Sequence, residues 1–493
     1  MSDAARLLWT DPELDHRRQE KSAHALIAVR RAVEEDAGLE GAAEFLEFYA
    51  TVAKADSADF TTLWQDPAAY HWVRRAVHLL AARRGAPPPA WESTYSTALG
   101  ARDATQALAL HLRQFAKFVL GLGIVAHQDV RFATPYETIL PLSVPATPLT
   151  LIGDGRIGIH GLLDGAVEIT DGGGRRRFFP GAASSSSGNY AQTCPVVTIG
   201  EACVMLKPHL FHLPGLALFG ELNTQTLAFQ ERHTQVVAEA LEILARLHPL
   251  SFSHLARSIR IIALKPAREH DFGTFSTSEL PGAFICSAPS DPFALAADFI
   301  HELHHNRLFA IEESVPLFEP GAADPIEGDH YYSPWRDAPR PLHGLLHALY
   351  VYLPVFRFWS AALREGALGG ALLGYARDQL ARIPFQLRIG VNQLRRYARF
   401  TASASVLFEE MAREAAEIEE EAAALGATLD IGAVACRASG ALRSVVDERD
   451  GRVLSVGETL HQHLSKWDLH GQCAAEKALL ERPVRRAFEA NSV

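Results

Sequence analysis

The residues best suited to chemistry lie in one short segment, His301-Glu302-Leu303-His304-His305, which has the pattern H-E-x-x-H. Residues four positions apart on a helix lie on the same face, so His301 and His305 can reach one divalent metal ion. Glu302 points into the same site, and in metallopeptidases this glutamate is the general base. The motif therefore predicts a metal centre. The plain alternative is an accidental pair of structural histidines, because the chain has 22 of them.

The sequence around the motif predicts the helix that the metal centre needs. Ser290-Asp291-Pro292 supplies a capping residue followed by proline at the first helical position. Residues 293–311 contain no glycine or proline, and Ser314-Val315-Pro316 ends the run. We therefore expect one helix to begin at Pro292 and to carry both histidines.

A third ligand has to come from outside the motif. A second long helix is expected to start near Pro341 or Leu342, with Pro354 as a kink. It carries His343 and His347, again four residues apart on one helical face. This pair is the best source of a third metal ligand in the sequence.

Two classes of metallopeptidase supply their third ligand differently. Metzincins extend the motif with a glycine and a third histidine, but Leu308 and Ile311 stand at those places. In a thermolysin-like peptidase a later glutamate would be needed, and the nearest candidates are Glu319 and Glu327. Both lie in proline-rich chain that is poor for a helix. Three imidazoles, or two plus a carboxylate, suit zinc hydrolysis and iron(II) oxygen chemistry alike, so spacing alone leaves both open.

Three ordered blocks carry a resemblance to a known family: STSELPGAF at 276–284, FIHELHH at 299–305 and WRDAPRPLHGLLHALY at 335–350. Together they resemble the HExxH-type peptide β-hydroxylases, which are 2-oxoglutarate-dependent enzymes found with ribosomally made, modified peptides. The resemblance covers about residues 220–425. His304 and the segment after residue 426 depart from the family's pattern.

The resemblance implies iron(II) held by His301, His305 and a downstream histidine, which corresponds best to His347. It implies O₂ and 2-oxoglutarate as cosubstrates, and hydroxylation at a side-chain β-carbon of a precursor peptide. It also implies that His343 lies beside the metal rather than on it. In such a hydroxylase Glu302 orders the site instead of activating water. A zinc-dependent peptidase with the same two motif histidines is the alternative function.

Other side chains would hold the cosubstrate and the peptide. The distal carboxylate of 2-oxoglutarate favours a fork-shaped arginine. The expected partners are Arg340, Arg388 and Arg395, of which the last two lie seven residues apart on one face of a predicted helix. Arg336 and Arg396 are further candidates, and Tyr331, Tyr332 and Trp335 are candidates to line a peptide groove.

Composition limits the class of protein. The 493 residues carry a net charge of -11, which argues against nucleic-acid binding. Five cysteines without C-x-x-C pairing are typical of reduced thiols in the cytoplasm. The N-terminal residues show no secretory signal, and no uninterrupted apolar stretch predicts a membrane span.

The expected fold is mainly α with a smaller, antiparallel β portion, an α+β class with the metal site between two helices. A jelly roll is not expected because it needs about eight strands. The expected regions are a helical one at 1–135, a β-rich one at 136–215, the catalytic one at 216–425 and a mixed extension at 426–493. Gly153-x-Gly155-x-x-Gly158 matches a dinucleotide fingerprint, but no helix follows it, so we interpret it as a β-turn.

Overall fold

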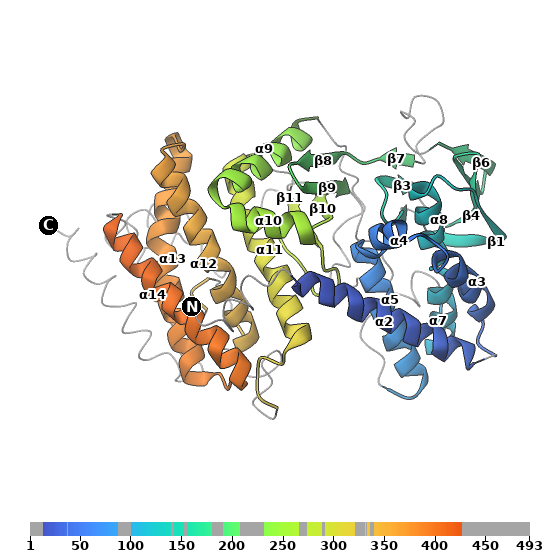
Figure 1. Cartoon of the computed structure of the whole chain (residues 1–493), viewed down its shortest axis with the longest axis horizontal. Coiled ribbons are helices and arrows are strands. Elements are labelled where there is room, and N and C mark those ends of the chain that lie inside the picture. The colour runs from blue at the N-terminus through green and yellow to red at the C-terminus, as the bar shows by residue number, and fades with distance from the viewer. Residues whose placement is uncertain are drawn as a thin grey trace, which may run out of the picture. The chain divides into compact units, whose positions relative to one another are not determined.

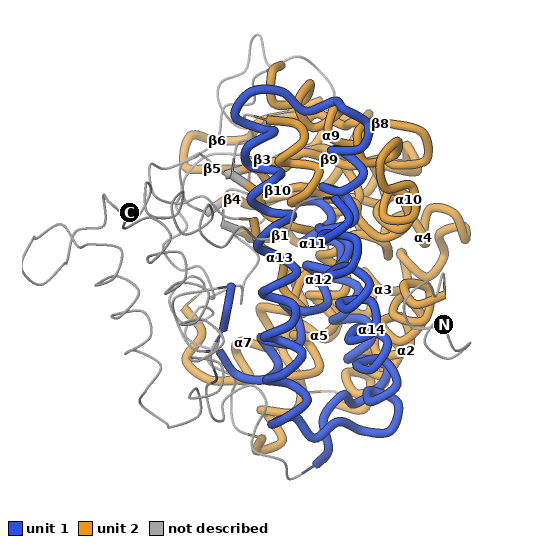
Figure 2. The backbone as a smooth tube through the Cα atoms, turned by 90° about the vertical axis from the view of Figure 1, so that its left-hand side faces the viewer, with its two compact units in different colours: residues 1–11, 299–493 blue, residues 12–298 orange. Residues whose placement is uncertain are grey.

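The computed structural model describes residues 13–36, 38–86, 100–139, 142–151, 156–179, 191–207, 231–265, 274–287, 291–320, 331, 333–335 and 340–425. These residues form a mixed α+β structure in which helices predominate, as the sequence predicted. The chain divides into two compact units (Figure 2): an N-terminal unit, 12–298, and a C-terminal unit, 1–11 with 299–493. The division falls within the expected catalytic region, whose boundaries stay a prediction. The expected extension at 426–493 lies outside the described residues.

The N-terminal unit contains eight of the described helices and all of the described strands (Figure 1). Its helices are α2 (Leu14–Glu34), α3 (Ala42–Val52), α4 (Ser57–Trp64), α5 (Pro67–Arg83), α7 (Ala104–Arg113), α8 (Ala116–Val125), α9 (Glu231–Leu247) and α10 (Pro249–Ser258). Aspartates cap several of these helices. Asp66 accepts from the Ala68 amide with proline at the next position, and Asp103 caps α7 by accepting from the Gln106 amide.

The strands of this unit form three sheets. They are β1 (Val130–Ile139), β2 (Leu142–Ser143), β3 (Leu149–Leu151), β4 (Arg156–Leu163), β5 (Ala166–Asp171), β6 (Gly174–Phe178), β7 (Ala191–Thr193), β8 (Val196–Ile199), β9 (Ala202–Lys207), β10 (Ile261–Lys265) and β11 (Ala283–Ser287). The sheet orders are β1-β4-β5-β6, β2-β3-β7 and β11-β10-β9-β8. Strand β1 begins at Val130, inside the region expected to be helical. Gly158 lies in β4, so a strand and not a helix follows the glycine pattern.

The expected antiparallel character is wrong for the third sheet. β10 pairs in parallel with both β9 and β11, and only β8 and β9 pair antiparallel there. Parallel neighbours need a long crossover connection. Helices α9 and α10 lie in the chain between β9 and β10, and they pack against β8 and β9 (Figure 1).

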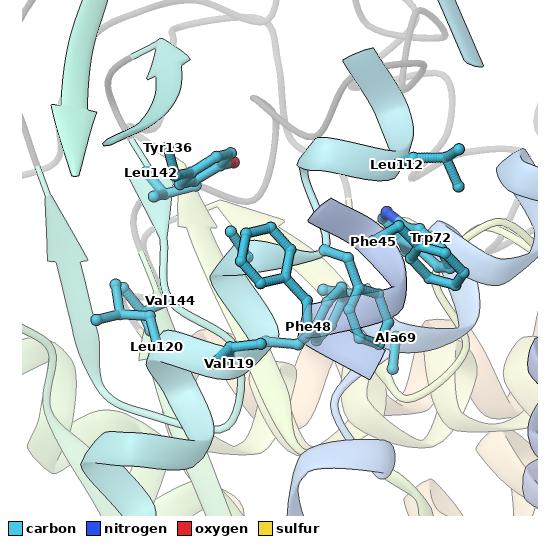
Figure 3. Close-up of a cluster of buried hydrophobic side chains, with 14 of the residues drawn as sticks. Phe45, Phe48, Ala69, Trp72, Leu112, Val119, Leu120, Tyr136, Leu142 and Val144 are labelled. Carbon is cyan, nitrogen blue, oxygen red and sulfur yellow. The ribbon is translucent and has the colours of Figure 1, made fainter. Parts of the chain in front are cut away.

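Aromatic side chains form the centre of the N-terminal core (Figure 3). The indole of Trp72 stacks on Phe45 with ring centroids 5.5 Å apart, and Phe115 meets it edge-on at 4.7 Å. Trp72 Nε1 donates to the His111 carbonyl at 2.9 Å, and His111 Nε2 bonds the Trp72 carbonyl at 2.8 Å. Both buried polar groups are therefore satisfied, and burial lowers the pKa of His111 well below its usual value.

One stretch, Ala104–Val125, has the length and apolar composition of a membrane span. Its most apolar window is 78% buried inside the structure. The stretch comprises α7 and α8, and its side chains Leu108, Phe115 and Phe118 belong to the core just described. Burial of this kind is what a core helix requires.

The C-terminal unit is built from long helices (Figure 1). They are α11 (Pro292–Ser314), α12 (Leu342–Glu365), α13 (Gly370–Tyr397) and α14 (Ala402–Ala424), and the division between the units falls within α11 after Asp298. Helix α12 packs against both α13 and α14. It continues through Pro354 to Glu365, and Gly366, which has a φ of 69°, follows its last residue.

Carboxylates of α14 tie this helix to α12. Glu421 accepts hydrogen bonds from Arg357, Ser360 and Arg364, and its side chain is 15% exposed. Because three donors of α12 meet one carboxylate, the pair of helices has a defined register. The C-terminal half of α12 is therefore held against α14.

Candidate metal centre

The motif helix forms as its sequence signals indicate. It begins at Pro292, and the Asp291 carboxylate accepts from the Ala294 amide at 2.9 Å. His301 and His305 lie one turn apart, and both side chains are partly exposed. Their Nε2 atoms are 3.1 Å apart. Two nitrogens bound to one ion at about 2.0–2.1 Å lie roughly 3.0–3.4 Å apart, so this pair has the spacing of two ligands on one metal.

The second helix brings His347 to this pair. His347 Nδ1 lies 2.9 Å from His305 Nδ1, and the two rings stack at 5.2 Å between centroids. The side chain of His347 is 5% exposed. The structure therefore brings together the three histidines that the sequence and the resemblance indicated. They form a row with His305 in the middle, and His305 presents Nε2 to His301 and Nδ1 to His347.

A carboxylate that the sequence analysis missed completes the cluster. Glu312 Oε1 lies 2.7 Å from His343 Nε2 and 3.2 Å from His347 Nε2. Ligand atoms of Glu312, His343 and His347 all lie within 4.8 Å of one another, close enough to hold a metal ion. Helical spacing was the available signal. Glu312 follows His305 by seven residues, which is two turns along the same face.

Burial determines the protonation of the cluster. Desolvation lowers the pKa of His305 well below its usual value, and the neighbouring charges of His301 and His347 act in the same direction. Desolvation also lowers the pKa of His347, although the Glu312 carboxylate opposes it. Burial works to raise the pKa of Glu312, but hydrogen bonds from His343 and His347 outweigh it and lower the pKa. Neutral imidazoles beside an ionised carboxylate are the donor set that a cation requires.

Glu302 and His304 occupy other faces of α11. The Glu302 side chain is 1% exposed, and its backbone carbonyl accepts from Asn306 Nδ2 at 3.1 Å. His304 Nδ1 donates to the Ile300 carbonyl at 2.8 Å, and its ring packs 5.8 Å from Tyr350. Both residues lie on the buried side of the helix. The motif therefore places the ligand candidates His301 and His305 on one face, and Glu302 and His304 on the buried side.

The three arginines expected to bind 2-oxoglutarate lie in different surroundings. Arg388 and Arg395 share a face of α13, as predicted, but their guanidinium groups bond Glu419 and Glu409 of α14 at 2.7 and 2.8 Å. Arg340 precedes α12 and pairs through its backbone with Tyr331. Its positive charge is among the causes that lower the pKa of His305 and of His347. Of these three, only Arg340 acts on the histidine row.

Aromatic residues extend from the row on the side of His301. The ring of Tyr352 meets His301 edge-on at 5.3 Å, and Trp335 stacks on Tyr352 at 5.8 Å. Trp335 thus joins the site through Tyr352, a residue the sequence analysis did not single out. Tyr331 is 7% exposed and packs 4.9 Å from the ring of Tyr397, which is a structural role.

The remaining candidates fall outside this cluster. Glu319 is exposed, and its amide bonds the Arg399 carbonyl at 2.9 Å. Glu327, Tyr332 and Arg336 lie outside the described residues. Among the described residues, the one group of three or more acidic, histidine or cysteine side chains close enough to hold a metal is that of Glu312.

The first block of the resemblance belongs to the N-terminal unit. Glu279, in the middle of that block, lies 2.8 Å from Arg75 Nη2, 3.6 Å from Arg74 and 3.8 Å from His71, all on α5. The block therefore attaches the chain before β11 to α5. A cavity of about 290 Å³ in the same unit lies between α3, α7 and β1, and Arg113 and Tyr136 line it together with Glu44.

Comparison of the chain with models of protein families and with curated proteins finds no match. The residues of the cluster and the resemblance of the three sequence blocks are therefore the features that indicate a function.

Proposed function

We propose that this chain is an iron(II)- and 2-oxoglutarate-dependent oxygenase that hydroxylates a side-chain β-carbon of a ribosomally synthesised precursor peptide. The supporting observation is the row of His301, His305 and His347, in which His305 approaches His301 through Nε2 at 3.1 Å and His347 through Nδ1 at 2.9 Å. Binding of one ion by all three therefore requires a ring of the row to turn. The centre then lies between two helices, α11 and α12, rather than in a jelly roll. Cytoplasmic localisation belongs to the same proposal.

Imidazoles are suitable ligands for iron as well as zinc. An iron(II) ion with three protein ligands has open positions for both 2-oxoglutarate and O₂, and one turnover converts 2-oxoglutarate, O₂ and a C–H bond to succinate, CO₂ and C–OH. Burial lowers the pKa of His305 and of His347, which favours the neutral form of both rings, and helices α11 and α12 carry the three histidines. Loss of one ring should loosen the metal and disorder the open positions.

The side chains near the two ends of the histidine row differ, and we use this difference to assign a position to each substrate. Arg340 is the arginine whose charge reaches His305 and His347, so we assign it to the distal carboxylate of 2-oxoglutarate. Arg388 and Arg395 instead stabilise the packing of α13 on α14. Tyr352 and Trp335 offer flat apolar faces beside His301, which is the side we assign to the peptide.

The alternative is a zinc peptidase in which Glu302 activates water. The buried position of Glu302 is compatible with either function. The two are separated by metal analysis of full-length protein purified without added metal, followed by incubation of a candidate precursor peptide with iron(II), ascorbate and 2-oxoglutarate. We expect bound iron, formation of succinate and a gain of one oxygen atom on the peptide. Peptide-bond cleavage without succinate and without added oxygen would overturn the oxygenase proposal.

Two variants sharpen this test. His301→Ala should abolish turnover and lower the metal content, because it removes one ligand of three. Glu302→Gln should keep part of the oxygenase activity when iron is in excess, since no water has to be activated. A peptidase would lose roughly 10²–10⁴-fold in rate with its general base. Glu319→Gln is the matched control, because Glu319 is exposed and would matter only as the third ligand of a thermolysin-like site.

A further inference from the structure

Five consecutive residues of β1, Thr134 to Thr138, line the cavity of about 290 Å³ in the N-terminal unit. Side chains of a strand point alternately to its two faces, so a cavity on one face would be lined by every second residue. Contact with five residues in succession indicates that the cavity runs along an edge of the strand. Helices α3 and α7 supply the other walls.

This edge of β1 has no strand beside it in the part of the chain that the structure describes. β1 is an outermost strand of the sheet β1-β4-β5-β6, and β4 occupies its other edge. The register with β4 runs from Tyr136↔Ile159 to Ile139↔Arg156. In an antiparallel ladder, alternate residues direct their N–H and C=O groups to the same neighbour. Half of residues 136–139 therefore present both groups to the free edge, along the cavity.

The two faces of β1 differ along this edge. Tyr136 is buried, and its hydroxyl donates to Gln114 Oε1 of the segment that joins α7 to α8. On the same inner side, Phe48 of α3 and Leu110 of α7 give the cavity apolar walls. Glu137 points to the opposite face and is exposed. A strand added at this edge would therefore have one apolar face and one face beside a carboxylate.

The charges around the cavity are mainly negative. Among the described residues, Arg113 is the one basic side chain that lines it. Its guanidinium already bonds Glu44 at 3.3 Å and Glu40 at 3.0 Å. Glu137 adds a further carboxylate to the lining. Three carboxylates against one guanidinium leave this edge negative, which favours a basic partner.

From this geometry we propose that the free edge of β1 binds an extended peptide segment in which apolar residues alternate with lysine or arginine. The peptide adds a strand to the sheet through backbone hydrogen bonds to residues 136–139. Its apolar side chains pack against Phe48 and Leu110, and its basic side chains lie beside Glu137. Pro135 has no amide hydrogen, so the pairing begins beyond it. Binding needs no metal and no step of the proposed oxygenase reaction.

A second copy of the chain is the competing occupant of this edge. Two β1 strands paired edge to edge would bring the Glu137 and Glu44 carboxylates of both copies to one interface. Like charges across neighbouring strands oppose such pairing, whereas a basic peptide is complementary to the same groups. Sedimentation of the protein alone distinguishes the two occupants. We expect no dimer that depends on this edge, and a dimer that Glu137→Ala strengthens or Thr138→Pro abolishes would assign the edge to a second copy.

Short random peptides displayed on phage and selected on the full-length protein supply the probes, and fluorescence anisotropy gives the Kd of the enriched peptides. We expect sequences with alternating apolar and basic residues and without proline. Glu137→Lys should weaken their binding roughly tenfold or more, because an attraction becomes a repulsion. Glu201→Lys is the matched control, since Glu201 is exposed between β8 and β9 of another sheet, and its peptide affinity should equal that of the wild type.

Backbone pairing is tested on the enriched peptides by methylating each amide nitrogen in turn. An added strand bonds the edge through every second residue, so the loss of affinity should alternate along the peptide. Hydrogen exchange should slow in β1 and not in β6, which forms the opposite edge of the sheet. Unchanged affinity for Glu137→Lys, methylation effects without alternation, or a selection that yields no binding peptide would overturn the proposal. All these measurements are made without iron and 2-oxoglutarate, so they stand apart from the test of the oxygenase reaction.

Discussion

Gly390 leaves the space that the indole of Trp335 occupies, and replacing it with alanine should displace that indole. A Cβ atom at this position would lie 2.4 Å from Trp335 Cη2 and 3.1 Å from Cζ3. The indole has little room to retreat, since it stacks on Tyr352, and Gln386 of α13 donates to the Pro334 carbonyl at 2.8 Å. Gly390→Ala is therefore an overpacking change within the C-terminal unit.

The magnitude follows from two opposing effects. Replacing glycine by alanine inside a helix stabilises it by about 0.8–1.0 kcal/mol. Overpacking of a filled core costs about 1–3 kcal/mol. Gly374 lies in the same helix, is exposed, and has no neighbouring atom within 4 Å of an added Cβ. The difference between Gly374→Ala and Gly390→Ala cancels the helix contribution and should equal the overpacking cost.

Thermal unfolding of the two variants measures this difference. With about 2–4 °C per kcal/mol for a unit of this size, Tm of Gly390→Ala should lie at least a few degrees below that of Gly374→Ala. Tryptophan fluorescence of the folded protein should change for Gly390→Ala alone. If Gly390→Ala proves as stable as Gly374→Ala with unchanged fluorescence, Trp335 does not fill this space, and its link to His301 through Tyr352 is refuted.

Two further changes test buried charges. Burial lowers the pKa of Lys117 from 10.5 to about 8, so the unfolded chain binds more protons between these values and stability rises with pH there. Lys117→Met should raise the free energy of unfolding at pH 7, measured by urea unfolding, by up to about 3 kcal/mol, because one pKa unit corresponds to about 1.4 kcal/mol. The gain should shrink at pH 10, and an equal gain at both pH values would contradict this. Glu421→Gln should destabilise the C-terminal unit by about 1–3 kcal/mol, because Arg357, Ser360 and Arg364 lose a charged acceptor; an unchanged Tm would show that they contribute nothing there.

Local sequence signals predicted the elements that carry the site. The Asp291-Pro292 cap starts α11, and α12 begins at Leu342, with His343 and His347 one turn apart. Such signals succeed because capping and helical periodicity act over a few residues. Local signals of this kind do not predict the direction in which strands pair. Helices α9 and α10 lie between β9 and β10, so whether these two strands run parallel depends on how the helices cross over.

The chain itself determines which residues share a helical face, and the tertiary structure decides what that face meets. Arg388 and Arg395 share a face as predicted, yet they meet carboxylates of α14. His305 and His347 are 42 residues apart, and the packing of α11 beside α12 decides that their Nδ1 atoms approach to 2.9 Å. Glu312 gains its partners in the same way. Periodicity is a property of one helix, whereas the contact between two faces depends on the packing of the whole unit.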